Sequence, residues 1–232
     1  RRCRPADETQ MNSESDPAKG PAMVSFDDAF RRQLHELFVW RRDVRRFRTD
    51  PLPDGSIERL IEIACLSPSV GLSQPWRFVI VDDATRRRAV IEDFKACNAD
   101  ALRSYSGERA AKYAALKLSG LEEAPGHLAV FAEKTDHIGS GLGRATMPET
   151  SEYSVVAAIC SMWLAARAEG IGLGWVSILN PGRVREILEI PDGWKFIGYL
   201  CIGYPQAECD RPELEQAKWE SRRGPGECTI RR

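Results

Sequence analysis

The segment from Ser151 to Gly170 constrains the fold more than any other part of the chain. Apolar residues surround a helix drawn through it almost completely, with Val155, Ile159 and Met162 among them. Such a helix has to be buried on most sides, because no face of it is suited to water. We therefore expect it either at the centre of the domain or against a partner subunit.

The same segment does not predict a membrane span. Its uncharged apolar run extends from Tyr153 to Ala166, well short of the about 20 residues needed to cross a bilayer. The charges of the whole chain nearly balance, with 33 Lys and Arg against 34 Asp and Glu. A general nucleic-acid-binding protein would show a basic excess. We expect neither a membrane nor a nucleic acid as a partner.

The cysteines favour a reducing compartment. The chain has seven of them, an odd number, and no C-x-x-C pair. Cys65, Cys160 and Cys201 lie inside apolar runs, as reduced core thiols of a cytoplasmic protein do. The three histidines are spread widely along the chain, which does not favour a metal site. We expect a cytoplasmic protein without a bound metal.

Helices and strands follow one another without the strict alternation of a doubly wound sheet, so the pattern predicts an α+β fold. A single domain is expected over residues 25–223, after a disordered lead-in at 1–24 and before a tail at 224–232. Polar and alanine-rich residues at about 95–120 indicate an exposed excursion and a candidate lid. Ser25 is the expected cap of the first helix.

The remaining elements follow from periodicity and from turn residues. Further helices are expected at 54–67, 84–120, 151–170 and 180–190. Strands are expected at 76–81, 128–132, 172–179 and 194–204.

The first candidate for chemistry is the run Arg41-Arg42-Asp43-Val44-Arg45-Arg46, which follows the first helix. Four arginines in six residues make a cluster of positive charge, and the paired N–H donors of each guanidinium group suit a phosphate. A solvated helix end, where cations offset the helix dipole, explains the charges without any ligand. Asp43 does not help to bind an anion, so it either pairs with an arginine or has a role of its own.

The second candidate is Ser-Pro-Ser-Val-Gly-Leu-Ser-Gln-Pro-Trp-Arg-Phe at residues 67–78. Ser69, Ser73 and Gln74 can donate and accept hydrogen bonds, and Gly71 lets the backbone approach a ligand closely. A Ser- and Pro-rich turn between a helix and a strand is the purely structural interpretation.

The third candidate is Gly-Ile-Gly-Leu-Gly-Trp-Val-Ser at residues 170–177. It is not a dinucleotide fingerprint, because its glycines precede a strand instead of following one and opening a helix. A helix cap and a tight turn into a strand explain it better. Ser177 is then either an ordinary strand serine or a residue that points into a site.

Together and in this order, the three motifs resemble those of the nitroreductase-like flavoprotein family. The matching elements are Arg-Arg-x-x-Arg-x-Phe, Ser-Gln-Pro-Trp-x-Phe and Gly-x-Gly-x-Gly-Trp, and the resemblance covers about residues 26–223. It implies an α+β nitroreductase-like fold with a central, mainly antiparallel sheet flanked by helices. It also implies an intertwined homodimer with one FMN per subunit at the dimer interface.

The resemblance implies FMN contacts at the matching positions. The phosphate and ribityl end would be held by Arg41, Arg42 and Arg45, with Arg222 closing on the phosphate. The flavin ring would be lined, from the partner chain, by Ser69, Leu72, Ser73 and Gln74. The isoalloxazine would pack along Val176, Ser177 and Ile178. Arginines suit a dianionic phosphate, and a flat ring needs apolar walls with a few polar donors.

Asp43 departs from the common family pattern, in which Ser or Thr follows the arginine pair. With the long excursion and Trp175-Val176-Ser177, this departure resembles a branch of the family that destroys its flavin. The implied reaction takes reduced FMN and O2 and yields 5,6-dimethylbenzimidazole, the lower ligand of vitamin B12, and erythrose 4-phosphate. Asp43 is then a candidate FMN contact and general base, and Ser177 would hydrogen-bond near the flavin N5. A covered ring excludes a nicotinamide, so a separate flavin reductase would supply the reduced FMN.

Two other functions stay open on the sequence. An NAD(P)H-dependent nitro or quinone reductase would use the same fold with an open flavin face, and it would keep its FMN intact through turnover. A flavin-binding carrier or regulatory protein would bind FMN without reducing it and without oxygen-dependent loss.

Overall fold

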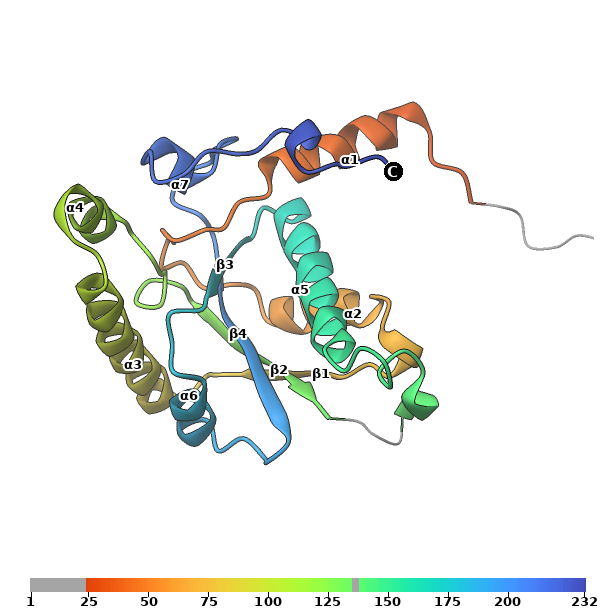
Figure 1. The fold of residues 1–232 in the computed structure, drawn as a ribbon, viewed down its shortest axis with the longest axis horizontal. Helices are drawn as coiled ribbons and strands as arrows, with labels where there is room; N and C mark the ends of the chain where they lie inside the picture. Colours follow the sequence, from red (N-terminus) through yellow and green to blue (C-terminus); the bar gives the residue numbers. More distant parts are fainter. Residues whose placement is uncertain (1–23, 135–137) are drawn as a thin grey trace, which may run out of the picture.

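Four antiparallel strands form the central sheet, in the order β1-β2-β4-β3 (Figure 1). The computed structural model describes residues 24–134 and 138–232. The strands are β1 (Trp76–Ile80), β2 (Gly126–Glu133), β3 (Gly172–Val176) and β4 (Trp194–Gly203). The α+β fold with an antiparallel sheet, expected from the sequence, is confirmed.

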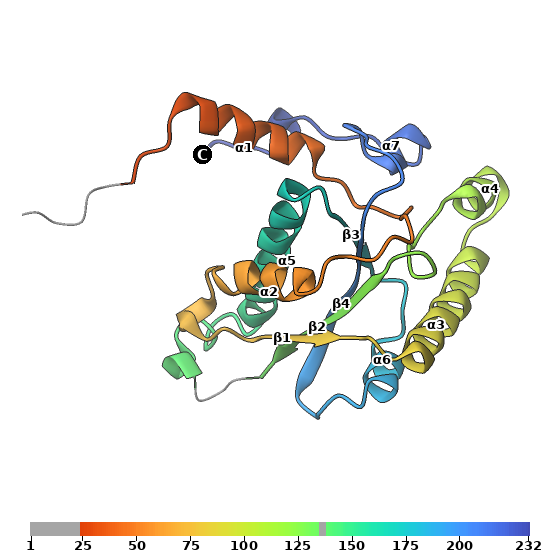
Figure 2. The same cartoon turned by 180° about the vertical axis from the view of Figure 1, so that it is seen from behind.

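Helices cover both faces of this sheet (Figures 1 and 2). Because successive side chains of a strand point to opposite faces, Leu128 and Val130 of β2 join one core cluster and Ala129 and Phe131 join the other. The first cluster is completed by α2 (Ser56–Cys65) and α5 (Thr150–Ala168). The second is completed by α3 (Ala84–Arg103) and α6 (Pro181–Ile187). A sheet buried on both faces explains why its central strands contain few charges.

α5 has the buried face that its composition predicts, but it is not buried all round within one chain. Val155, Ile159 and Met162 are fully buried against α2 and the sheet. Tyr153 and Val156, on another side of the helix, are exposed. The single chain therefore leaves part of the apolar surface of α5 uncovered.

α1 (Asp28–Trp40) begins later than expected. Its cap is Asp27, whose carboxylate accepts the main-chain N–H of Phe30 at 2.8 Å, so the expected cap at Ser25 is wrong. The negative charge of an aspartate at this position also interacts favourably with the positive end of the helix dipole. The apolar face of α1 is present, but Phe30 and Phe38 are exposed in the single chain.

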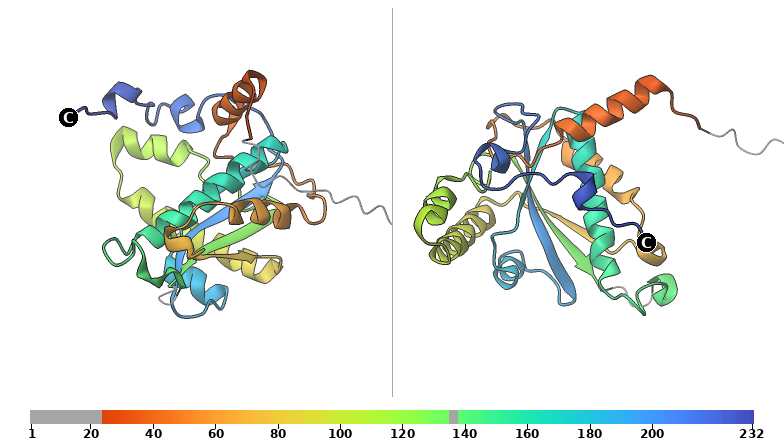
Figure 3. Two further views of the ribbon diagram at one scale, coloured as in Figure 1. Left: turned by 90° about the vertical axis from the view of Figure 1, so that its right-hand side faces the viewer. Right: turned by 45° about the horizontal axis from the view of Figure 1, so that its top comes forward.

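The expected helix at 84–120 is two helices. α3 ends at Arg103, and α4 (Gly107–Ala115) starts after a turn. Gly107 has a φ of +56°, a left-handed conformation that interrupts a helix and that glycine adopts most easily. The C-terminal segment contains α7 (Glu213–Gln216) and lies on the same side of the molecule as α4 (Figure 3).

Shorter helical turns lie at Val70–Leu72 (η1), Ile138–Gly141 (η2) and Pro225–Glu227 (η3). Almost all of the expected lead-in at 1–24 lies outside the described residues. Within the described part of the chain, no helix combines the length and the apolar character that a bilayer crossing requires.

Candidate functional site

The arginine segment crosses directly over β3. Asp43 forms a parallel bridge with Leu173, and the main-chain N–H of Val44 donates to the Leu173 carbonyl at 3.1 Å. This approach needs glycine in β3, since a Cβ at Gly174 would lie 2.0 Å from the Val44 carbonyl oxygen. The motif at 170–177 thus has two structural tasks. Gly170, with a φ of +71°, follows α5 as expected, and Gly174 makes room for the arginine segment.

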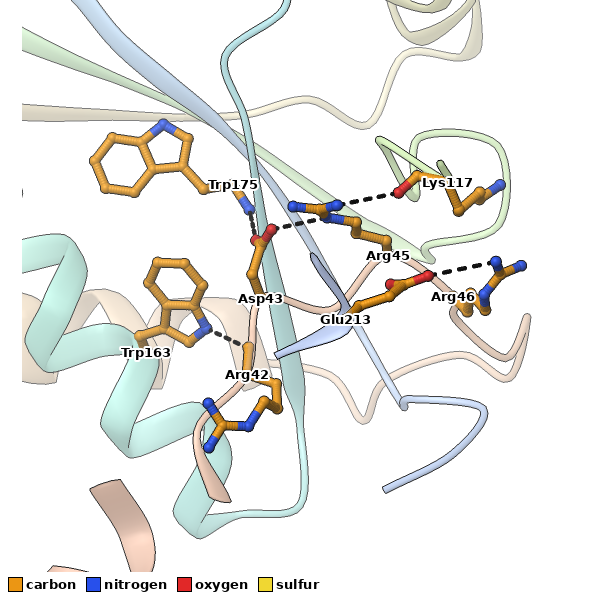
Figure 4. A network of polar contacts seen from close by, with 8 residues as sticks. All are labelled: Arg42, Asp43, Arg45, Arg46, Lys117, Trp163, Trp175 and Glu213. Carbon is orange, nitrogen blue, oxygen red and sulfur yellow. Dashed lines mark hydrogen bonds and ion pairs between the residues drawn. The ribbon is translucent and has the colours of Figure 1, made fainter. Parts of the chain in front are cut away.

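Asp43 is fixed by two donors (Figure 4). One carboxylate oxygen accepts the main-chain N–H of Trp175 at 2.8 Å, and the other accepts Nε of Arg45 at 3.0 Å. Arg45 in turn donates to the carbonyl of Lys117 at 3.3 Å, just beyond α4. The Asp43 side chain is 31% exposed. Its carboxylate is therefore held in one orientation while it stays accessible to a ligand.

Arg42 is fixed between α5 and the C-terminal segment. Its guanidinium donates to the carbonyls of Cys209 at 3.1 Å and Asp210 at 2.8 Å. Its own carbonyl accepts the indole N–H of Trp163, at 3.0 Å (Figure 4). Burial, and after it the charges of Arg222 and Arg41, lower the pKa of Arg42 below its ordinary value. A bound anion would relieve this crowding of positive charge.

Between the arginine segment and the C-terminal segment lies a cleft of about 270 Å³. Its walls carry the guanidinium groups of four arginines and two carboxylates. The lining residues are Arg42, Asp43, Val44, Arg45, Arg46, Gln206, Ala207, Cys209, Arg211, Glu213 and Gln216. The positive excess suits a phosphate, and Glu213 is already paired with Arg46 at 3.4 Å.

Arg41 and Arg222 lie around this cleft without lining it. The guanidinium carbon of Arg41 stands 5.0 Å from the ring centroid of Trp163, a cation–π contact. Arg222 is exposed, and its charge acts on Arg42. The structure thus brings all the predicted phosphate-binding arginines to one region.

The serine motif occupies a different part of the chain's surface. The main-chain N–H of Val70 donates to Ser154 Oγ at 3.1 Å near the start of α5, whereas Trp163 holds the arginine segment nine residues further along. At 1.5 Å rise per residue, these two anchor points are about 13 Å apart along the helix. One chain therefore does not bring Ser69, Leu72, Ser73 and Gln74 together with the arginines.

The backbone of the serine motif is held in an uncommon conformation. Gly71, Leu72 and Gln74 have φ values of +56°, +52° and +45°, and Ser69 Oγ accepts the main-chain N–H of Gln74 at 3.1 Å. The Leu72 side chain is 73% exposed. Ser73 is buried, and its hydroxyl has no partner among the described residues. Non-glycine residues with such φ values cluster at functional sites and ligand clamps.

The segment 176–178 continues from the end of β3. Val176 is buried in the second core cluster, so it does not face a ligand on the surface of the single chain. Ser177 is exposed and lies two residues beyond the N–H that holds Asp43. The two residues expected to be catalytic are thus fixed at one end of one strand.

Sequence reasoning missed two groups of residues. The indole of Trp163 and the main-chain N–H of Trp175 orient the arginine segment, and residues 206–216 form half of the cleft. Trp163 was recognised only as an apolar residue of its helix. The C-terminal residues have no periodic pattern that would mark them as a cleft wall.

Comparison with known proteins agrees with this geometry. The model of the nitroreductase family matches residues 38–204. The chain belongs to the nitroreductase family. The family match includes the arginine, serine and glycine motifs, and it ends before the C-terminal wall of the cleft.

Two curated relatives within the family have the same name. A 5,6-dimethylbenzimidazole synthase of Rhodospirillum rubrum is 56% identical over 85% of this chain and 94% of its own length. A second protein of that name, from Rhodobacter capsulatus, is 45% identical over 85% of this chain and 95% of its own length.

Solved structures of the family share the fold. An iodotyrosine deiodinase bound to FMN and 3-iodo-L-tyrosine superposes with a TM-score of 0.64 at 24% identity, over 76% of this chain and 91% of that one. A BluB-like flavoprotein of Clostridium difficile 630 gives a TM-score of 0.65 at 18% identity, over 85% and 97%.

Proposed function

We propose that the chain is an enzyme that makes 5,6-dimethylbenzimidazole from reduced FMN and O2, with erythrose 4-phosphate and the remaining four-carbon, two-nitrogen pyrimidine fragment of the flavin ring as the other products. The observation that carries this proposal is the 56% identity to a 5,6-dimethylbenzimidazole synthase over 198 residues. Asp43 supports it from the structure, because a fixed carboxylate stands at the wall of an arginine-lined cleft. Such a carboxylate can act as a general base, which a serine in its place cannot.

The residues around the cleft fit the phosphate end of FMN. Arg42 and Arg45 line the cleft, and Arg41 and Arg222 add positive charge beside it. Burial, and after it the charges of Arg222 and Arg41, lower the pKa of Arg42, and a bound anion would offset this positive charge. Reduced FMN, when bound, supplies both the electrons that activate O2 and the carbon skeleton that is cut.

A second copy of the chain would complete the site as a homodimer. The serine motif, with exposed Leu72 and Gln74, is anchored near the start of α5, whereas the arginine segment is anchored further along this helix at Trp163. The Ser73 hydroxyl is buried within the motif and has no hydrogen-bond partner among the described residues. Apolar residues of α1 and α5 are exposed beside these segments, Phe38 at 55%, and a partner subunit would cover them.

In this arrangement Asp43 removes a proton from the ribityl chain close to the ring. Two donors fix its carboxylate before the ligand arrives, so little reorganisation is needed for the proton transfer. Ser177 hydrogen-bonds near N5 and orients the ring. The lid segment, defined as residues 95–120, excludes water during the reaction.

The supply of reduced flavin falls to a separate flavin reductase, because a lid closed over the ring leaves no room for a nicotinamide. The cytoplasm is the proposed location. The cysteines of the described residues are free thiols, as they would be in a reducing compartment. Cys201 is buried as expected, but Cys65 and Cys160 are exposed in the single chain, so the expectation that they are core thiols is wrong there.

The test is a single-turnover reaction without a partner enzyme. FMN is reduced chemically under anaerobic conditions, mixed with a stoichiometric amount of protein and then exposed to air. The proposal predicts that the oxidised-flavin absorbance fails to return and that a mass corresponding to dimethylbenzimidazole appears. Full return of the oxidised-flavin spectrum would overturn it, and NAD(P)H-driven nitro or quinone reduction would then be assayed.

A further inference from the structure

An aromatic cluster joins the lid segment to the C-terminal segment. The Trp219 ring packs edge-on against Tyr105 and Tyr113, with centroids 5.6 and 6.0 Å apart. The guanidinium carbon of Arg109 lies 3.9 Å from the Trp219 centroid, and the two tyrosines stack on each other at 4.9 Å. We call Tyr105, Arg109, Tyr113 and Trp219 the clasp. The clasp attaches α4 to the C-terminal segment that carries Trp219.

The clasp is firmly tied on the side of the lid segment. Tyr113 is buried, and its hydroxyl donates to the side-chain carbonyl of Asn98 on α3 at 2.8 Å. Trp219 is fixed from its own side, since its main-chain N–H donates to the Leu214 carbonyl at 2.9 Å. Lys218, with a φ of +53°, turns the chain between α7 and the indole. The backbone conformation of residues 214–219 therefore fixes the position of the indole.

The same C-terminal segment forms one wall of the arginine cleft. Arg42 donates to two of its carbonyls, and Arg46 pairs with Glu213. Trp219 lies six residues beyond Glu213 and three residues before Arg222, whose charge acts on Arg42. Residues 209–222 thus contact the cleft at one end and α4 through the clasp. α7 and α4 lie on the same side of the molecule (Figures 1 and 3).

We propose that Trp219 is a positioning residue that couples phosphate binding in the cleft to ordering of the lid segment. This inference rests on the proposed function. A phosphate held by Arg42 and Arg222 fixes residues 209–222, these residues fix the indole, and the indole holds α4 closed. Riboflavin lacks the phosphate, so it binds without fixing residues 209–222 and without ordering the lid segment. The family match ends at residue 204, so this coupling belongs to a segment outside the shared family core.

Hydrogen exchange of the main-chain amides at 105–118 measures the coupling directly. In the wild-type protein, saturating oxidised FMN is expected to slow this exchange about tenfold, a coupling of ordinary size, whereas saturating riboflavin slows it less than about twofold. In Trp219→Ala, FMN still binds but no longer slows exchange at 105–118. Because coupling is reciprocal, the same variant binds FMN about tenfold more weakly and riboflavin unchanged.

Two further variants separate coupling from mere structural damage. Trp219→Phe keeps an aromatic ring in the clasp and is expected to restore most of the FMN-dependent protection. Glu220→Gln, at the neighbouring exposed position, is the matched control and keeps the wild-type behaviour. Should Trp219→Ala fail to fold, Arg109→Gln removes only the cation–π contact and is expected to reduce the FMN-dependent protection by about half on a logarithmic scale.

Each possible outcome of these measurements supports or contradicts the proposed coupling. Equal protection of 105–118 by FMN in Trp219→Ala and in the wild type would overturn the inference, as would equal protection by FMN and riboflavin. If FMN binds and protects as described but survives reduction and air, the coupling stands and the proposed reaction fails. If FMN does not bind to the wild type, both proposals fail.

Discussion

The carboxylate of Asp43 accepts the main-chain N–H of Trp175 at 2.8 Å, across 132 residues of sequence. Its other oxygen accepts Nε of Arg45 at 3.0 Å. A serine at this position has one hydroxyl oxygen and cannot span both donors. The aspartate therefore joins the arginine segment to the end of β3, close to Ser177, and it fixes the two candidate catalytic residues relative to each other.

Replacing Asp43 with asparagine tests its role as a base. Asp43→Asn keeps an oxygen for the Trp175 N–H but removes the negative charge. We expect FMN affinity within about threefold of wild type and oxygen-dependent loss of reduced FMN slowed by about 10² to 10⁴. Single-turnover absorbance after admission of air measures the rate. The matched control is Asp50→Asn, which changes an exposed carboxylate paired with Arg48 at 2.8 Å and should react at the wild-type rate. If Asp43→Asn slows the reaction less than tenfold, Asp43 is not the general base.

The crossing of the arginine segment over β3 predicts a severe effect of one methyl group. Gly174→Ala places a Cβ 2.0 Å from the Val44 carbonyl oxygen, well inside van der Waals contact. We expect the free energy of unfolding to fall by about 2 kcal/mol or more, as overpacking does, together with loss of FMN binding. Urea unfolding measures the first and fluorescence titration the second. Gly226→Ala, where a Cβ meets nothing within 4 Å, should leave both unchanged.

A buried histidine predicts that the fold weakens in mild acid. His127 lies 3.0 Å from the hydroxyl of Tyr199 in the core, and burial, followed by the charge of Arg87, lowers its pKa to about 4. The folded protein therefore binds fewer protons than the unfolded chain. This contribution to stability is complete above about pH 6.5 and is lost as the pH falls toward 4, by about 2 kcal/mol between pH 7.5 and 5.

The pH effect is checked by urea unfolding at pH 7.5 and 5. A double variant, His127→Leu with Tyr199→Phe, removes both partners at once, so neither is left buried and unpaired. The difference in stability between the two pH values should shrink by about 2 kcal/mol in this variant. His35→Gln, on the exposed side of α1, should keep the wild-type difference, and an unchanged difference in the double variant would contradict the assignment to His127.

A site shared between two chains predicts complementation between defective variants. Arg42→Ala disables the arginine half, and Gln74→Ala disables the serine half. Each alone should be nearly inactive. Denatured and refolded together in equal amounts, they should recover about one quarter of the wild-type activity, because half of the dimers carry one intact site of two. Recovery of no activity from the mixture, with dimers present by light scattering, would show that each chain builds its own site.

The sequence was sufficient to predict the elements of the core. The nearly continuous apolar runs of β2 and β4 and the apolar pattern of α2 and α5 follow from burial, which acts locally on each strand or helix. The sequence does not identify the cap of α1, because Ser25, Asp27 and Asp28 are all suitable capping residues and only the hydrogen bond to Phe30 selects Asp27. The alanine-rich pattern continues past Gly107, so the break between α3 and α4 depends on the left-handed conformation of this one glycine.

The candidate site was harder to predict for a physical reason. Its composition is visible in three motifs, but its geometry depends on contacts between distant segments. The need for Gly174 depends on Val44, and the cleft depends on residues 206–216, which have no pattern of their own. Trp219 appears in the sequence as a single aromatic in a polar tail, and only its contacts with α4 give it meaning.

The crossing of Val44 over Gly174 also bears on how the protein is synthesised. A ribosome adds roughly 5 to 20 residues per second, so Trp175 emerges about 7 to 26 s after Asp43. During that interval the arginine segment has no strand on which to lie, and the C-terminal wall of its cleft is made later still. A nascent or truncated chain is thus unable to capture flavin, and ligand binding is confined to translation products that are nearly complete.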